Sequence, residues 1–421
     1  MDRQDYEVLV PLEDVQRIVL ASCPLLNPVE IDLDGSLGFV LAEDVRAPED
    51  LPPFANTAMD GYALIAADTV GAPVELSVIG VLAAGSAPRQ AVEPGTAIQI
   101  MTGAPMPPGA DGVAIVERTE PGSSPDRIRI LEHVTPGVYV RAAGSDLHRG
   151  DLALAAGTVI GPADVGLLAS IDAARFAVHP RPRVGVLSTG DELVGSGTPL
   201  ELGQIRDSNR LGLLAALQRD GFVGVNLGAR RDEEEVISTG LREGVERCDA
   251  LLTSGGVSMG EFDFVKIALE KLVGEIGGQI HHFKVAIKPA KPLSFAVLAT
   301  PAGRVIPVFG LPGNPVSSMV SYQVVALPAL RKLAGHRSPL PRPIPAVAVE
   351  DFERRPDGKL HLLRVVAAMG PDGRIVVRSA GGQASHQLAA MAAANALALV
   401  PDGAGVVAGG EVLILLTGSL E

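Results

Sequence analysis

One stretch of the chain decides its fold: residues 248–263, Cys-Asp-Ala-Leu-Leu-Thr-Ser-Gly-Gly-Val-Ser-Met-Gly-Glu-Phe-Asp. The segment 250–253 is short and apolar, which predicts a buried strand rather than a helix. Gly255 and Gly256 then predict a loop whose missing side chains let a ligand approach the backbone. A helix is predicted from near Asp263 to about Leu272. The three elements together are typical of an anion site, because free N–H groups and the helix dipole converge there. Plain chain reversal is the alternative interpretation.

The neighbouring sequence repeats this plan of strand and helix. Further strands are predicted at Val184–Leu187, Val223–Leu227, Phe283–Ile287, Leu293–Leu298 and Val305–Phe309. One helix is predicted to begin at Ser208 as its cap, and another at Asp232, which would form a capping box with Glu235. The last helix is predicted from Val316 to about Leu333, with a kink at Pro328. Strands that alternate with helices predict a doubly wound α/β sheet.

The flanking sequence has a different texture. Proline and glycine punctuate residues 45–146, where strands are predicted at Val74–Ile79, Ala97–Met101, Val113–Glu117 and Arg127–Leu131. A first helix follows Pro11, a short one follows Pro162, and strands return after Ser338. We therefore predict a multidomain protein of the α/β and β classes. Its parts are a small mixed N-terminal linker domain (1–44 plus 147–180), a β-rich domain (45–146), the α/β domain (181–335) and a C-terminal β-barrel-like domain (336–421).

Composition argues against nucleic-acid and membrane partners. The net charge of −14 and the aromatic content of 3% disfavour a nucleic-acid partner, since its phosphates would meet an acidic surface with few stacking side chains. The most apolar run, residues 388–400, is too short to cross a bilayer, and the acidic N-terminus is unlike a signal peptide. Two cysteines, Cys23 and Cys248, cannot form a disulfide framework. We therefore expect a cytoplasmic protein.

Charged residues follow the predicted strands of the α/β domain. Ligands bind beyond the carboxyl ends of the strands in sheets of this kind. The acids Glu192, Asp232 and Asp263 come after strands, and three lysines lie in and after a further one: Lys284, Lys288 and Lys291. This combination suits a divalent metal ion and a phosphorylated, anionic substrate. Helix capping by the aspartates and solvation of the lysines is the alternative.

Seven motifs carry a resemblance to a known family. They are Leu51–Ala63, Thr102–Ala104, Ser188–Leu193, Ile205–Asn209, Gly255–Asp263, Lys288–Pro292 and Leu311–Ser317. In this order they resemble the molybdopterin molybdenumtransferases, the MoeA and gephyrin E-domain family, over nearly the whole chain. The resemblance implies a four-part structure and insertion of molybdate into the dithiolene of adenylylated molybdopterin, with release of AMP. It also implies dependence on Mg²⁺.

The functional residues of the family carry over onto positions of this chain. The resemblance implies catalytic groups at Asp60, Thr102, Glu192, Asp232, Asp263 and Lys288, with Glu192, Asp232 and Asp263 as metal ligands. It implies substrate-binding positions at Asp146, Ser188, Thr189, Gly190, Gly255, Gly256, Ser258, Lys284, Lys291, Pro312, Pro315 and Ser385. The sulfurs that receive molybdenum belong to the substrate, so no catalytic cysteine is expected.

Two positions depart from the family pattern. Ala290 stands where the family usually has glycine. We expect the loop that holds Lys288 and Lys291, the lysine loop, to differ slightly because alanine resists a positive φ. The family's Gly-Glu-Asp appears as Gly144-Ser145-Asp146, which keeps the acid and changes its neighbour. Neither departure removes one of the acids or lysines named above.

The resemblance also implies partners. In this family the β-rich domain faces the α/β domain of the partner subunit, so a homodimer with a shared site is expected. A molybdopterin adenylyltransferase and apo-molybdoenzymes are further expected partners. Two alternatives for the function stay open: the adenylyltransferase itself, which shares the α/β fold, and a non-catalytic scaffold like the gephyrin E domain. Intact acids and lysines favour an enzyme, and the single predicted α/β unit favours metal insertion.

Overall fold

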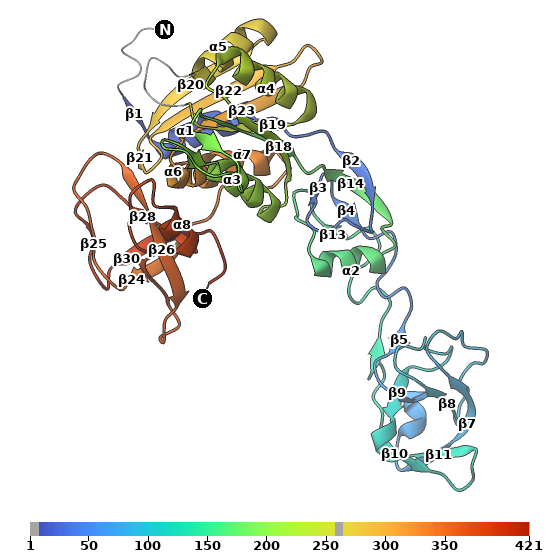
Figure 1. Ribbon diagram of the computed structural model, residues 1–421. Coiled ribbons are helices and arrows are strands. Elements are labelled where there is room, and N and C mark those ends of the chain that lie inside the picture. The colour runs from blue at the N-terminus through green and yellow to red at the C-terminus, as the bar shows by residue number, and fades with distance from the viewer. Residues whose placement is uncertain (1–7, 257–263, 421) are drawn as a thin grey trace.

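A mixed sheet forms the centre of the computed structural model, which describes residues 8–256 and 264–420 (Figure 1). Its strand order is β1 (Leu9–Val10), β20 (Gly278–Val285), β22 (Pro292–Ala299), β23 (Val305–Leu311), β19 (Ala250–Ser254), β15 (Arg183–Thr189) and β18 (Val223–Arg230). The last four of these strands run parallel, whereas β22 is antiparallel to both of its neighbours. Short connections before and after β22 explain this, because parallel neighbours need a long crossover.

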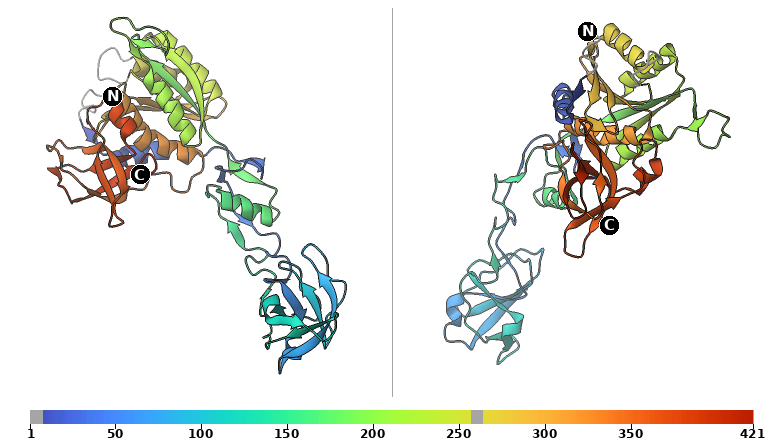
Figure 2. Two further views of the ribbon diagram at one scale, coloured as in Figure 1. Left: turned by 60° about the horizontal axis from the view of Figure 1, so that its bottom comes forward. Right: turned by 90° about the vertical axis from the view of Figure 1, so that its left-hand side faces the viewer.

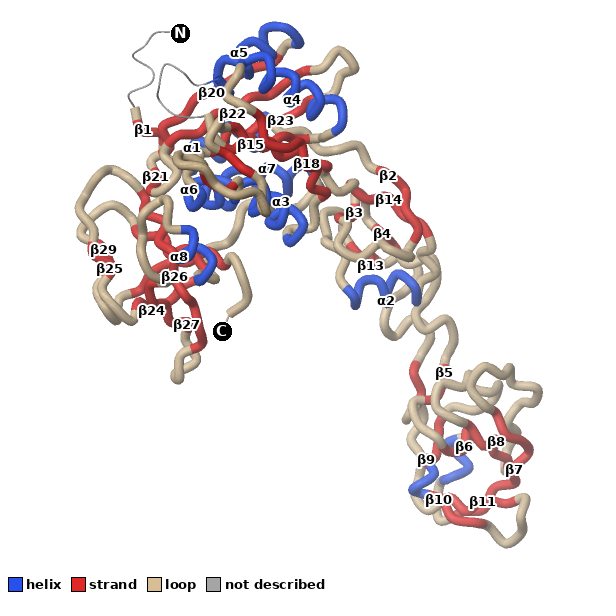
Figure 3. Tube along the Cα trace, viewed as in Figure 1, coloured by secondary structure: helices blue, strands red, loops and turns tan. Residues whose placement is uncertain are grey.

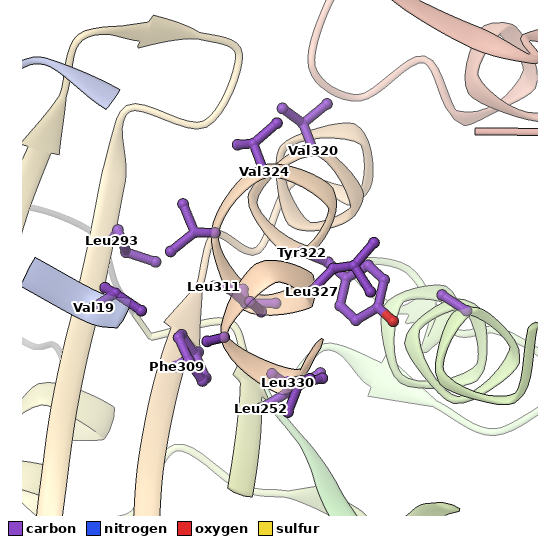
Figure 4. Close-up of a cluster of buried hydrophobic side chains, with 14 of the residues drawn as sticks. Val19, Leu252, Leu293, Phe309, Leu311, Val320, Tyr322, Val324, Leu327 and Leu330 are labelled. Carbon is purple, nitrogen blue, oxygen red and sulfur yellow. The ribbon is translucent and has the colours of Figure 1, made fainter. Parts of the chain in front are cut away.

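Helices cover both faces of the sheet, which confirms the doubly wound prediction. On one face α4 (Glu234–Arg247) and α5 (Phe264–Ile276) bury Ile237, Leu241 and Leu269. On the other face α3 (Ser208–Arg219) and α6 (Pro315–Ser321) pack over a larger core. Figure 4 shows part of this core, with Phe309 and Leu252 of the sheet near Leu330 of α7 (Leu327–Leu333). Apolar residues at helical spacing supply one buried stripe on α4 and α5, whereas α6 and α7 are buried over most of their surface.

The first helix, α1 (Leu12–Ser22), belongs to this larger core. Val15 and Val19 are fully buried there, and α1 contacts α7. Strand β1 extends the sheet beside Lys284. The predicted N-terminal linker domain joins residues 1–44 with 147–180, whereas β1 and α1 pack against the α/β sheet. The helical pattern shows which face is buried, but it does not show which element covers that face.

The last helix is interrupted one turn before Pro328. A π-helical turn, Tyr322–Ala326, separates α6 from α7. Pro328 has no N–H to donate to the carbonyl four residues earlier, and the backbone widens at that point. The predicted kink thus takes the form of this π-helical turn.

Two predicted helix caps were wrong. The cap of α3 is Asp207, whose side chain accepts a hydrogen bond from the backbone N of Arg210, rather than Ser208. Helix α4 begins after Glu233, which makes no side-chain cap hydrogen bond, so Asp232 and Glu235 form no capping box. Glu235 instead pairs with Lys271 of α5 at 2.6 Å. This leaves the Asp232 carboxylate free of a capping role.

Two β-rich parts extend away from the sheet (Figures 1 and 2). The nearer part holds β2 (Val29–Asp32), β3 (Val40–Leu41), β4 (Val45–Arg46), β13 (Leu152–Leu154), β14 (Arg175–His179) and α2 (Pro162–Ser170). The paired strands β5 (Asn56–Thr57) and β12 (Val140–Arg141) lead on to the outer part. Its sheet has the order β10 (Thr119–Pro121), β11 (Arg127–Ile130), β7 (Val74–Leu82), β8 (Thr96–Ile100), β6 (Gly61–Leu64) and β9 (Gly112–Ile115).

The C-terminal part is a closed barrel, as predicted, lying beside the α/β sheet (Figure 3). It is formed by β26 (Leu360–Met369), β27 (Ile375–Ser379), β24 (Ile344–Ala348), β30 (Glu411–Leu416) and β28 (Ala396–Val400), and pairing of β28 with β26 closes it. A short helix, α8 (Leu388–Ala393), precedes β28, and β25 (Phe352–Glu353) pairs with β29 (Gly405–Val406). Strand β21 (Ile287–Lys288) pairs with β26 and so ties the lysine loop to the barrel. None of the helices within the described ranges is long and apolar enough to cross a bilayer.

Candidate functional site

A cleft of about 420 Å³ opens where the parallel strands β15 and β19 end. Several predicted site residues line it: Ser188, Thr189, Glu192, Gly255 and Pro315. Asp207, Asn209 and Ser254 also line it, and His386 and Leu388 come from the segment that precedes β28. The cleft therefore lies between the carboxyl ends of the sheet and a loop of the C-terminal part, where ligands of open α/β sheets bind.

A hydrogen-bonded network forms one wall of the cleft. Ser188 Oγ donates to Asp207 Oδ2 over 2.6 Å, and the Nε of Arg210 donates to the same oxygen over 2.7 Å. Asn209 Nδ2 donates to Ser254 Oγ over 2.8 Å and to the Gly313 carbonyl over 2.7 Å. Asp207 and Asn209 were not predicted as site residues, although both lie in one of the family-like motifs, Ile205–Asn209. The Asp207 bond to Ser188 and the Asn209 bond to Ser254 fix the start of α3 against the ends of β15 and β19.

Glycines let the strand ends approach one another. Gly255 has φ 101°, and a Cβ there would lie 2.5 Å from the Thr189 carbonyl oxygen. Gly256 has φ 64°, a left-handed conformation that also favours glycine. Gly190 has φ 151°, and its Cβ would lie 2.6 Å from a carboxylate oxygen of Glu192. Larger side chains at these positions would fill the space next to Thr189 and Glu192.

Three carboxylates gather at one side of the site. The backbone N of Asp232 donates to Asp191 Oδ1 over 3.2 Å, and Asp191 precedes Glu192 in the chain. Burial, and then the charges of Asp191 and Glu192, raise the pKa of Asp232 above its usual range. A bound cation would relieve this repulsion between like charges. Asp191 was not predicted, and only its position between Gly190 and Glu192 pointed to it.

These carboxylates suit Mg²⁺ in the chemistry of their oxygens. No group of three or more acidic, histidine or cysteine side chains comes close enough to hold a metal ion within residues 8–256 and 264–420. The third predicted ligand, Asp263, and the predicted substrate contact Ser258 lie outside the described residues. The structure thus brings Asp232 and Glu192 near one another and leaves the complete ligand set as a prediction.

The lysines lie at the same end of the sheet. Lys284 pairs with Pro292 near the end of β20, and Lys288 and Lys291 are exposed in the loop between β20 and β22. Among the described residues, Lys288 and Lys291 make no ion pair. Ala290 has φ 79° and is buried, so alanine adopts the positive φ that we expected it to resist. Its packing in the large core compensates a cost of about 1–2 kcal/mol for that conformation.

The loop after β23, which carries Pro312 and leads to Pro315, meets the C-terminal part at the cleft. Pro312 is buried and Pro315 is the first residue of α6. The backbone N of Val316 donates to the Ser385 carbonyl over 3.1 Å, which holds Ser385 and His386 at the cleft. Arg364, buried in the barrel, donates to the carbonyls of Gly382 and Ala384 and so shapes this loop. Arg364 was not predicted, because an arginine within an apolar strand pattern gives no sign of its partners.

Asp60 and Thr102 form a separate pair in the outer sheet. Asp60 Oδ1 accepts hydrogen bonds from the backbone N of Thr102 at 2.6 Å and from its Oγ1 at 2.8 Å. Both bonds lower the pKa of Asp60, and the bond from the backbone N has the larger effect. Asp60 precedes β6 and Thr102 follows β8, and Figure 3 places both strands at the opposite end of the molecule from β15. Asp146 is exposed near the connection to this part, so one chain does not bring these three residues to the cleft.

Comparison with family profiles covers most of the chain. Residues 10–171 match the MoeA N-terminal region (domain I and II). Residues 185–332 match a "probable molybdopterin binding domain", and residues 347–417 match the MoeA C-terminal region (domain IV).

Curated proteins and solved structures agree with these matches. The chain is 37% identical over 409 residues to molybdopterin molybdenumtransferase 2 of Mycobacterium tuberculosis, covering 96% of this chain and 98% of that protein. It is 34% identical to the molybdopterin molybdenumtransferase of Haemophilus influenzae, covering 97% and 98% of the two chains. A crystal structure of the molybdopterin biosynthesis MoeA protein from Pyrococcus horikoshii OT3 superposes with a TM-score of 0.80 at 27% identity, covering 97% of this chain and 100% of that one.

Proposed function

Because this chain belongs to the molybdopterin molybdenumtransferase (MoeA) family, we propose that it inserts molybdate into adenylylated molybdopterin and releases AMP. It is a transferase of molybdenum cofactor biosynthesis, with molybdopterin and molybdenum as substrates. The observation that carries the reaction is the cleft, which combines open glycine backbone with the carboxylate of Glu192. Two exposed lysines, Lys288 and Lys291, follow a strand at the same end of the sheet. A phosphorylated pterin and an oxyanion need all three features.

The lysines supply positive charge for the phosphate groups of the substrate and for molybdate. Lys288 and Lys291 are exposed beside the strand ends, where ammonium groups attract phosphate and tetrahedral molybdate as point charges. We assign these groups to binding and orientation of the substrate, and the dithiolene sulfurs of the substrate receive the metal.

Glu192 and Asp232 would hold Mg²⁺ together with Asp263, each through carboxylate oxygens. The ion, when bound, neutralises charge on the phosphoryl oxygens during cleavage of the bond to AMP. The raised pKa of Asp232 supports this assignment, because crowded carboxylates gain most from a cation. Asp191, hydrogen-bonded to the Asp232 backbone, holds that residue in place.

We further propose a homodimer that shares each site between subunits. Asp60 and Thr102 are hydrogen-bonded and exposed, yet they lie far from the cleft of their own chain. Exposed apolar side chains surround them: Met59, Met101 and Val116. A patch of this kind suits burial against another subunit. The partner's cleft is then the surface that Asp60 and Thr102 complete.

The partners beyond the dimer follow from the substrate and the product. A molybdopterin adenylyltransferase would supply the adenylylated substrate, and apo-molybdoenzymes would accept the finished cofactor. Both free cysteines are buried and unpaired, which suits the reducing cytoplasm. The adenylyltransferase and scaffold alternatives are not favoured, since the full-length relatives are named as molybdenumtransferases.

Reconstitution of a molybdoenzyme tests the proposal. The purified protein, adenylylated molybdopterin, molybdate and Mg²⁺ should together activate an apo-molybdoenzyme. Omission of this protein, or of molybdate, should leave that enzyme inactive. Equal activation without this protein would contradict the proposed function.

A further inference from the structure

The lysine loop is paired with the barrel at two positions. In the β21–β26 pair, Ile287 lies opposite Leu360 and Lys288 lies opposite His361. Ile287 and Leu360 both pack in the large core. Because side chains alternate along strands, Lys288 and His361 stand together on the other face of this pair. A barrel residue is thus the side-chain neighbour of a lysine in the loop at the carboxyl end of the sheet.

His361 is held in place by charged residues of the barrel. Its Nε2 lies 3.2 Å from Asp357 Oδ1 and 3.3 Å from Oδ2. Asp357 also accepts from Arg354 over 2.7 Å and from Lys359 over 3.0 Å. The Arg354 side chain is only 2% exposed and bonds Asp402 as well, so the acceptor of His361 is itself fixed. Since a carboxylate only accepts hydrogen bonds, Nε2 carries the proton.

The environment keeps the ring of His361 neutral. Burial lowers its pKa, and the charges of Arg354 and Lys288 act in the same direction, against the hydrogen bond to Asp357. A further charge, that of Lys359, is held close to these groups by its ion pair with Asp357. A neutral imidazole beside Lys288 adds no repulsion to its ammonium group and occupies the space on one side of its stem.

Resting on the proposed function, in which Lys288 binds the anionic substrate, we propose that His361, oriented by Asp357, is a positioning residue for Lys288. The fixed ring occupies space beside the lysine stem and so restricts the conformations that its ammonium group can adopt. This ordering precedes substrate binding, so less conformational entropy is lost when the substrate arrives. The barrel therefore contributes to the site through the β21–β26 pair as well as through the loop that holds Ser385.

A double-mutant cycle tests the proposal. The four proteins are the wild type, His361→Ala, Lys288→Ala and the double variant, each assayed for kcat and KM with adenylylated molybdopterin. His361→Ala should raise KM about tenfold, as expected for loss of one ordering contact, with a smaller change in kcat. In the Lys288→Ala background it should have no further effect, because the residue acts through the lysine. His361→Gln should retain a KM near that of the wild type, since its amide N–H can still donate to Asp357.

His179→Ala is the matched control. His179 and His361 are both 8% exposed, and His179 bonds the Leu26 carbonyl over 2.9 Å, away from the lysine loop. This variant should lose stability and leave KM unchanged. If His361→Ala does not fold, the cycle is run with Asp357→Asn, which weakens the same support.

The outcomes separate this proposal from the proposed function. A rise in KM from His361→Ala that is equal in both backgrounds would overturn the positioning role alone. An unchanged KM in Lys288→Ala would overturn the binding role of Lys288, and the positioning role with it. A rise in KM in His179→Ala as large as that in His361→Ala would also overturn the positioning role, because it would reflect a general loss of structure.

Discussion

Asn209 donates a hydrogen bond to Ser254 over 2.8 Å and so joins the first turn of α3 to the end of β19. The same amide group reaches the Gly313 carbonyl over 2.7 Å. One side chain thereby connects three segments that line the cleft.

Replacement of Asn209 by alanine should impair activity more than stability. The Ser254 hydroxyl and the Gly313 carbonyl lose their donor, and each lost bond costs about 1 kcal/mol on folding. The looser cleft should lower kcat/KM by about tenfold or more, since small displacements of positioning groups are costly. Steady-state kinetics and thermal unfolding measure the two effects. Asn395→Ala is the control, because Asn395 donates two similar bonds within the barrel, and it should lower stability without a comparable loss of kcat/KM.

Glu192→Gln should lower the rate of cofactor formation at least about 100-fold, the order of magnitude found when a charge-stabilising group is lost. The glutamine keeps the size of the side chain but no longer offers a charged ligand to Mg²⁺. Glu201→Gln is the matched control, since Glu201 is an exposed acid in the following loop and does not line the cleft. Cofactor formation is measured with each protein after circular dichroism has verified its fold. Wild-type rates in folded Glu192→Gln would exclude Glu192 from catalysis.

Two inactive variants should restore activity when their subunits are mixed. Asp60→Ala and Glu192→Ala each damage one side of the proposed shared site. In a mixed dimer one of the two sites combines an intact Asp60 with an intact Glu192, so up to about half of the sites per mixed dimer recover. Activity is measured after subunit exchange has been verified with differently tagged chains. Complete inactivity of verified mixed dimers would argue for a site within one chain.

Val19→Ala should lower the free energy of unfolding by about 1–3 kcal/mol, because it removes buried methyl groups from a packed core. Val19 is fully buried against the α/β part, and Figure 4 shows it beside Leu293. Urea unfolding followed by circular dichroism measures the loss. Val29→Ala is the control, since Val29 is exposed on β2 and should change stability by less than about 0.5 kcal/mol. Equal effects of the two substitutions would contradict the placement of α1 in that core.

Hydrophobic patterns and turn residues predicted most of the α/β fold. The strand that begins at Ala250 occurs where expected, and the helix predicted to end at about Leu272 continues to Ile276. Both elements were predictable because a short apolar run and a helical stripe are local properties of the sequence. The antiparallel strand β22 and the location of α1 depend on contacts between distant segments, which no local pattern specifies. The predicted capping box failed for a similar reason: the Glu235 side chain pairs with Lys271 of another helix and does not cap its own helix.

The sequence predicted individual residues of the site more readily than their arrangement in space. The motifs named Ser188, Glu192 and Gly255, all of which line the cleft. The sequence pattern did not point to Arg364 or His361, because their bonds to Gly382 and Asp357 depend on how the barrel folds. Ala290 was expected to alter the lysine loop, yet it adopts φ 79°, because tertiary packing outweighs the local preference.

Release of AMP under two substrate conditions measures the proposed reaction most directly. With adenylylated molybdopterin, Mg²⁺ and molybdate, the pure protein should release AMP and yield a cofactor that activates an apo-molybdoenzyme. With free molybdopterin, ATP, Mg²⁺ and molybdate, it should form no cofactor, since the described part of the chain holds one α/β sheet of this kind. Cofactor formation from free molybdopterin and ATP, or no molybdate-dependent AMP release from the adenylylated substrate, would contradict molybdate insertion as the activity of this protein.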